Sequence, residues 1–166
     1  METKEWKFID KSDWPNGPWH QEPDKMQFPD EETGLPCLIR RSYFGGSLCG
    51  YVGITEDHPL FGVDYSCSPH IPSLDCEINV HGWISFSGLG QETKENCLGI
   101  CHIPGPGEPG KIWWFGFDCA HWFDLRPADK YSLKVMGKYG AYRDIVYVKK
   151  EIAKLAKQLA EIKCKK

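Results

Sequence analysis

The feature that most constrains the fold is an aromatic stretch from Trp113 to Asp124, which reads WWFGFDCAHWFD. Aromatic residues favour β-strands, and so much apolar surface is unfavourable in water. We therefore predict a central strand over residues 112–118. At its end Asp118, His121 and Asp124 recur at intervals of three residues. If the chain turns helical there, these side chains share one face, and we expect them to be fully paired or functional because their desolvation is unfavourable.

Two further segments have strand patterns. Residues 35–43 and 47–55 are joined by Phe-Gly-Gly, which predicts a β-hairpin with glycine where positive φ is needed. Residues 76–87, CEINVHGWISFS, alternate between apolar and polar side chains and predict a half-buried strand. The polar face of that strand carries His81 beside Trp83, so it can line a cleft. His58 follows the hairpin in a loop before proline, where binding residues often lie.

The remaining segments complete a single α+β domain, as expected for 166 residues. Residues 1–34 contain four prolines and predict an extended arm over the surface. Residues 35–141 form the β-rich core, a mainly antiparallel sheet of about five strands. Residues 142–166 form an amphipathic helix, because apolar residues recur at spacings of three and four. Its narrow apolar seam either packs on the sheet or forms a homodimer.

Composition excludes several functions. A net charge of −3 argues against general nucleic-acid binding, although residues 149–166 hold seven Lys and two Glu, which is either a solvated helix face or a contact for an anionic partner. No run reaches the roughly 18 apolar residues of a membrane span, and the N-terminus lacks a signal-peptide pattern. We therefore expect a cytoplasmic protein with reduced cysteines and no membrane contact.

A divalent metal is one interpretation of the cluster that ends the aromatic stretch. Asp118, His121 and Asp124, joined by His81 or His58, offer the imidazole and carboxylate ligands that suit zinc, manganese or iron. The alternative is a satisfied hydrogen-bond cluster that holds the end of the strand. No metalloenzyme string such as HExxH is present.

The cysteines allow two other hypotheses. A structural zinc site is conceivable, the alternative being ordinary buried thiols. Cys119 lies between Asp118 and His121 and is a candidate nucleophile, although strand alternation favours an inward-packed side chain. The residues of the zinc hypothesis are Cys67, His70, Cys76, Cys97, Cys101 and His102.

Several strings carry a family resemblance: LCGYVGI at 48–54, HPLFG at 58–62, VHG at 80–82, WWFGFDCAH at 113–121 and YRDIVYVKKEIAKLAKQL at 142–159. On these strings the chain resembles a widespread family of uncharacterised proteins encoded by bacteria and their phages. The family has no established reaction, so the resemblance implies a phage-like or bacterial cytoplasmic setting. Where that family tends to have histidine followed by two glycines, this chain has Trp83 in place of the second glycine, which would reshape a pocket there.

Together these features predict a small-molecule site, for a nucleotide-like ligand, between the strand of residues 76–87 and the end of the aromatic strand. Trp83 or Trp114 would stack on a base, and Arg40 or Arg143 would meet the anion. An enzyme would hydrolyse the ligand, with His81 and His121 dividing proton donation and removal. A binding protein would only sequester a nucleotide, and an interaction protein would use its C-terminal helix. At the small-molecule site His81, Asp118, His121 and Asp124 would orient the ligand or cleave it.

Overall fold

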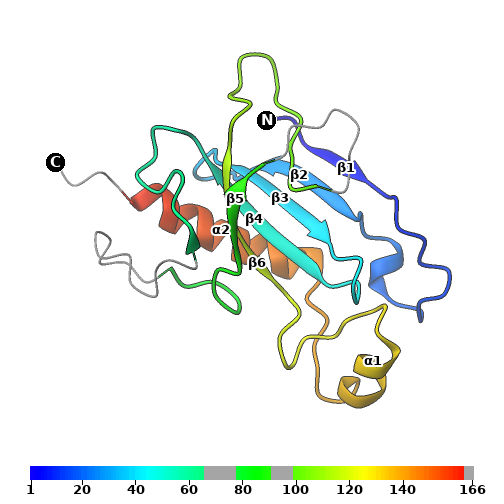
Figure 1. Ribbon diagram of the computed structural model, residues 1–166. Helices are drawn as coiled ribbons and strands as arrows, with labels where there is room; N and C mark the ends of the chain where they lie inside the picture. Colours follow the sequence, from blue (N-terminus) through cyan, green and yellow to red (C-terminus); the bar gives the residue numbers. More distant parts are fainter. Residues whose placement is uncertain (66–77, 91–98, 163–166) are drawn as a thin grey trace.

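The structure, a computed structural model, describes residues 1–65, 78–90 and 99–162. Within these ranges six strands form one antiparallel sheet in the order β1-β2-β3-β4-β6-β5, with a long helix across one face (Figure 1). This arrangement confirms the predicted α+β class. The elements are β1 (Lys4–Trp6), a 3₁₀ turn (Pro18–His20), β2 (Lys25–Pro29), β3 (Pro36–Arg41), β4 (Leu48–Ile54), β5 (Phe86–Leu89), β6 (Trp113–Asp118), α1 (Lys130–Met136) and α2 (Ile145–Glu161).

The predicted hairpin and aromatic strand both form. β3 pairs with β4, and the turn between them holds Gly45 at φ 88° and Gly46 at φ 75°, the positive values that the Phe-Gly-Gly signal predicts. β6 lies between β4 and β5, so it is bonded on both edges. Phe115 and Phe117 pack in the core against α2, and Trp114 is fully buried on the opposite face.

The N-terminal arm contributes more than a surface covering. Two of its segments are strands, because β2 pairs along β3 and β1 pairs along β2 at the edge of the sheet. The prolines lie mainly in the connection between β1 and β2, where Trp19 is buried against the ring of Tyr142. The prediction of an extended arm therefore missed the sheet pairing, since strands this short carry little period-two signal.

The predicted strand over residues 76–87 is wrong for most of the part that the structure describes. Residues 78–85 form no strand, and β5 begins only at Phe86. Gly82 and Trp83 have φ values of 60° and 68°, which reverse the chain, and the Trp83 amide donates to the Val80 carbonyl at 3.1 Å. Residues in this left-handed region cannot continue a pleated strand. Residues 76 and 77 lie outside the described ranges.

The C-terminal helix α2 begins slightly later than predicted. The Asp144 carboxylate accepts a hydrogen bond from the Tyr147 amide at 2.8 Å and caps the helix, so Tyr142 and Arg143 precede it. Its apolar seam packs against β3 and β4 of its own sheet. Of the two alternatives for the seam, packing on the sheet is therefore the one observed, and a homodimer through the C-terminal helix stays a prediction. No helix in the described ranges combines the length and apolar character that a bilayer crossing requires. The fully buried seam residues are Val148, Ile152, Leu155, Ala156 and Leu159.

Candidate functional site

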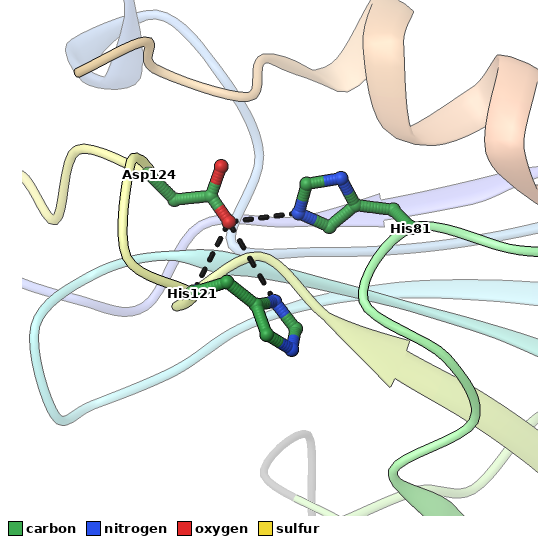
Figure 2. Close-up of side chains that lie close together, drawn as sticks. All are labelled: His81, His121 and Asp124. Atoms are coloured by element: carbon green, nitrogen blue, oxygen red, sulfur yellow. Dashed lines mark hydrogen bonds and ion pairs between the residues drawn. The ribbon is translucent and has the colours of Figure 1, made fainter. Parts of the chain in front are cut away.

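Two segments far apart in sequence meet near the start of α2. The turn around His81 and the segment after β6 bring His81, His121 and Asp124 together (Figure 2). His81 Nε2 lies 2.7 Å from Asp124 Oδ2, and the two imidazole rings are 5.3 Å apart between centroids. No helix forms between Asp118 and Asp124; instead the Asp124 amide donates to the His121 carbonyl at 2.9 Å in a turn. The convergence that the site hypothesis required is therefore present, with a different local backbone.

Asp124 is the centre of the cluster. Its side chain is only 2% exposed, and it accepts hydrogen bonds from Arg143 Nε at 2.7 Å, from His81 Nε2 and from the His121 amide at 3.1 Å. Burial alone would raise the pKa of Asp124, but the bonds from Arg143 and His81 outweigh it and hold the pKa below its usual value. Asp124 is therefore a carboxylate at neutral pH. Arg143 offsets the unfavourable burial of that charge.

His81 is held at both ring nitrogens. Its Nδ1 lies 2.9 Å from the Tyr147 hydroxyl, and its backbone amide donates to Glu151 at 3.0 Å. An ionised carboxylate only accepts hydrogen bonds, so we assign the proton to His81 Nε2, which faces Asp124. Nδ1 then accepts from the Tyr147 O–H group. This arrangement fixes the orientation of an imidazole that is 13% exposed.

His121 is the open member of the cluster. Its side chain is 39% exposed, and its Nδ1 lies 3.7 Å from Asp124 and 3.8 Å from Asp118. These distances are too long for hydrogen bonds but short enough for ion pairing when the imidazole is protonated. Asp118 is itself 35% exposed. His121 is therefore the imidazole that solvent or a ligand reaches most readily.

The backbone at Gly82 and Trp83 positions the two imidazoles. A Cβ atom at residue 82 would lie 1.9 Å from His121 Cε1, so only glycine lets the chain pass this close to the ring. Trp83, next in the chain, also has positive φ and is 72% exposed. Holding a bulky residue in this region costs about 1–3 kcal/mol, and such strain is found mostly at functional sites.

Two of the predicted ligand contacts lie elsewhere. Trp114 is buried on the opposite face of the sheet, so it is not available to stack on a ligand at the cluster. Arg40 pairs with Cys49, which pairs with Asp118, and paired residues point to the same face. Arg40 thus lies two strands, or about 10 Å, from Asp118. Of the two predicted arginines, only Arg143 contacts the cluster.

His58 lies at the far end of α2. Its Nε2 donates to the Leu159 carbonyl at 2.9 Å, while its Nδ1 accepts from the Leu60 amide at 3.1 Å. Twelve residues separate Leu159 from Tyr147, or about 18 Å along the helix. His58 therefore caps the end of α2, beside a hollow of about 340 Å³, and is not part of the cluster.

The cysteine hypotheses receive little support from the described residues. Cys119 is 1% exposed, and burial raises the pKa of its thiol well above the usual value, so it is not an activated nucleophile. The predicted zinc set cannot be assembled, because four of its six members lie outside the described ranges: Cys67, His70, Cys76 and Cys97. Of the other two, Cys101 is buried beside Lys25, and the His102 ring packs on Trp114.

Sequence reasoning missed Tyr147 and Glu151, which hold His81 through its ring and its amide. Both lie on α2 next to the apolar seam, four residues apart and therefore neighbours on the helix. Polar residues bordering a seam usually face solvent, so the pattern gave no sign that a loop from residue 81 would cover them. The helical spacing alone could have paired them with each other, but not with His81.

The cluster also has the composition of a metal site. One ligand atom each from His81, His121 and Asp124 lies within 4.8 Å of the others. The sequence predicted Asp118, His121 and Asp124, joined by His81 or His58. The structure brings His81 together with His121 and Asp124, whereas Asp118 lies 3.8 Å from His121 Nδ1 and His58 lies elsewhere. Comparison of the chain with protein-family models, curated proteins and solved structures gave no match. The resemblance to bacterial and phage proteins therefore stays a prediction, and the site rests on its geometry alone.

Proposed function

We propose that this protein binds a nucleotide-like, anionic small molecule at the His81–His121–Asp124 cluster and hydrolyses it, in a phage-like or bacterial cytoplasmic setting. The observation that carries the proposal is the convergence of His81 and His121 on one buried, ionised carboxylate. Imidazoles exchange protons near neutral pH, and acid or base catalysis needs such groups fixed in position.

Within this proposal the two imidazoles have different roles. His121 is the more exposed and would take the proton of the attacking water. The resulting imidazolium would be stabilised by Asp118 and Asp124, both within ion-pair distance of Nδ1. His81, bound at both nitrogens, would hold Asp124 in place. Proton removal is thus assigned to His121, and orientation to His81.

The surroundings supply groups for the rest of a nucleotide. The Arg143 side chain is 26% exposed, its Nε binds Asp124, and no described residue hydrogen-bonds its Nη atoms. Those atoms are suited to a phosphate. Trp83 and Trp122 are 72% and 74% exposed and lie within two residues of the two imidazoles in sequence. Exposed rings of this kind stack on bases.

The proposal is tested with a panel of mono-, di- and cyclic nucleotides, using calorimetry for binding and chromatography for turnover. His121→Asn should lower turnover by about 10²- to 10⁴-fold, the usual contribution of a positioned acid or base, with little change in affinity. His20→Asn is the matched control, because His20 lies on the N-terminal arm, where it contacts the Trp19 ring and hydrogen-bonds with the Pro15 carbonyl. Absence of binding to the whole panel would refute the proposal.

A second candidate is a protein that sequesters a nucleotide without cleaving it. The specific observation in its favour is that both ring nitrogens of His81 are engaged, which leaves one open imidazole for proton transfer. In that case nucleotides bind, no product forms, and His121→Asn changes neither result. The same titrations therefore separate the enzyme from the binder.

A further inference from the structure

We propose that His81, His121 and Asp124 bind one zinc ion, through His81 Nε2, His121 Nδ1 and Asp124 Oδ2. These three side chains come from two turns, one with His81 and one with His121 and Asp124, and have ligand atoms within 4.8 Å of one another. The inference rests on the proposed site but changes one role in it, because an imidazole whose Nδ1 binds zinc cannot also form the imidazolium proposed above. With zinc bound, the attacking water would be activated by coordination to the ion in place of proton removal by His121. Its test uses no nucleotide, so either proposal can fail while the other stands.

The distances require only small movements of the side chains. Zinc lies 2.0–2.2 Å from nitrogen and oxygen ligands, so two ligands of a tetrahedral site are about 3.3 Å apart. The His81 Nε2–Asp124 Oδ2 distance of 2.7 Å would open by about 0.6 Å, and the His121 Nδ1–Asp124 Oδ2 distance of 3.7 Å would close by about 0.4 Å. The two imidazole nitrogens lie within 4.8 Å of each other and would close by up to about 1.5 Å, which rotation of the half-exposed His121 side chain can supply.

The donor set selects the class of ion. Two imidazoles and one carboxylate suit zinc and similar transition metals, whereas magnesium and calcium prefer oxygen ligands throughout. Three protein ligands leave a fourth position of a tetrahedral site for water or another donor. The half-exposed Asp118 carboxylate lies 3.8 Å from His121 Nδ1.

Each of two ligands has an outer partner of the kind that metal sites use. Arg143 Nε binds Asp124 through Oδ1 at 2.7 Å, which leaves Oδ2 for the ion. Tyr147 lies 2.9 Å from His81 Nδ1. On binding, the proton leaves His81 Nε2 for solvent, one from solvent joins Nδ1, and the new N–H group donates to the Tyr147 oxygen. Such partners fix the tautomer of a metal-bound histidine.

Backbone geometry holds the two imidazoles ready for an ion. The ring of His121 rests against Gly82, where a Cβ would come within 2.4 Å of Cε1 and both ring nitrogens. His81, the residue before Gly82, is tied through its amide to Glu151. The two rings are therefore fixed relative to each other by backbone contacts, without any ligand. A metal site assembled in this way loses little conformational freedom on binding.

The test is a titration of chelator-treated, dialysed protein with zinc chloride, followed by calorimetry and by metal analysis after dialysis. We expect one zinc ion per chain and weaker binding of magnesium chloride. Loss of an outer partner typically lowers metal affinity about 10- to 100-fold, so Tyr147→Phe should weaken zinc binding by at least about 10-fold. His121→Asn removes a ligand and should weaken it by about 100-fold or more.

The fold of His121→Asn and the NMR signals of the histidine rings distinguish loss of a zinc ligand from loss of structure. His121 is half exposed, so His121→Asn should fold even if Asp124 variants do not, and His20→Asn should bind zinc as the parent does. Histidine ring ¹⁵N resonances should shift on zinc addition for His81 and His121 and not for His20. Failure to bind zinc would overturn the inference. So would zinc binding that His121→Asn leaves unchanged, because the ion would then lie outside the cluster.

Discussion

Two networks of charged side chains lie at the start of α2, and they are built in opposite ways. The first, which we call the Arg41 network, joins Arg41 to Asp24, Glu22 and Tyr142. The second is the His81–His121–Asp124 cluster with Arg143. Both pair a buried carboxylate with an arginine. Only the second contains imidazoles and half-exposed side chains.

The Arg41 network is closed. Arg41 and Asp24 have side chains that are 0% exposed, and Arg41 binds Asp24 at 3.1 Å, Glu22 at 2.8 Å and the Tyr142 hydroxyl at 2.8 Å. The remaining Asp24 oxygen accepts the amides of Phe8 and Ile9. Every member is satisfied by the chain itself, so the network fixes the N-terminal arm to the sheet.

The His81–His121–Asp124 cluster also has a buried carboxylate bound by an arginine, but part of it is exposed to solvent. Asp124 is as buried as a core residue, yet His121 beside it is 39% exposed. A closed network of arginine and carboxylates holds one charge state across the neutral range, whereas imidazoles change charge there. The comparison indicates that one network stabilises the fold and the other is free to exchange protons or bind an ion.

The largest expected effect comes from opening the Arg41 network. Asp24→Ala leaves a fully buried guanidinium without one of its carboxylates, so the free energy of unfolding should fall by about 3–5 kcal/mol. Urea denaturation at neutral pH measures the loss. Asp13→Ala, on an exposed residue of the same arm, is the control and should change little. A loss below about 1 kcal/mol for Asp24→Ala would show that the network is not a structural anchor.

Acid should weaken the same network. Burial alone would raise the pKa of Asp24, but hydrogen bonds from Lys11 and from the Ile9 and Phe8 amides outweigh it and leave the pKa below its usual value. A carboxyl with a depressed pKa stabilises the fold above its unfolded-state pKa, near 4, and this stabilisation is lost as pH falls through the folded-state pKa. The difference in unfolding free energy between the parent and Asp24→Ala should therefore shrink below about pH 4. A difference that stays constant down to pH 2 would contradict this explanation.

Adding a methyl group at Gly82 should have an intermediate effect on the free energy of unfolding. Gly82→Ala forces a Cβ into the His121 ring and adds the penalty of about 1–2 kcal/mol for positive φ. We expect a total loss of about 2–3 kcal/mol, together with weaker zinc binding. Gly62→Ala is the matched control: Gly62 also has positive φ, at 81°, but a Cβ there meets nothing within 4 Å. Equal losses in the two variants would show that His121 does not pack against residue 82.

The smallest expected effect concerns Trp83, and here the substitution should raise the free energy of unfolding where the preceding ones lower it. Trp83→Gly removes a bulky side chain from the left-handed region, so unfolding free energy should rise by about 0.5–1 kcal/mol. The same variant should weaken nucleotide binding by about 1–3 kcal/mol if the ring stacks on a base. Thermal unfolding and calorimetry measure the two quantities. Trp122→Gly, also exposed but without positive φ, should bring no gain in stability.

Much of the fold follows from periodic patterns in the sequence. The apolar seam of α2 and the Gly45-Gly46 turn are local signals, and both give the predicted element. The segment around His81 has the alternating residues of a strand, but two left-handed residues reverse the chain there, so the predicted strand does not form. Left-handed geometry at glycine leaves no mark in the hydrophobic pattern. At Trp83 it is disfavoured, so no propensity rule predicts it.

The candidate site was predictable in part. The three-residue spacing of Asp118, His121 and Asp124 drew attention to the right segment, and the pairing with His81 followed from expecting the two segments to be neighbours. Contacts that depend on tertiary structure were not accessible. Neither the contact of Tyr147 with the His81 ring nor the separation of Arg40 from Asp118 by two strands has a local signal, because both depend on how the helix and the strands are arranged in space.

Tyr142 and Arg143 are consecutive residues, yet Tyr142 belongs to the Arg41 network and Arg143 to the His81–His121–Asp124 cluster. One peptide unit therefore links the anchorage of the N-terminal arm to the site. An ion or nucleotide that tightens Arg143 against Asp124 would hold Tyr142 more firmly against Arg41. We expect trypsin to cleave the N-terminal arm more slowly when the site is occupied. Limited proteolysis of the arm would then report ligand binding at the cluster.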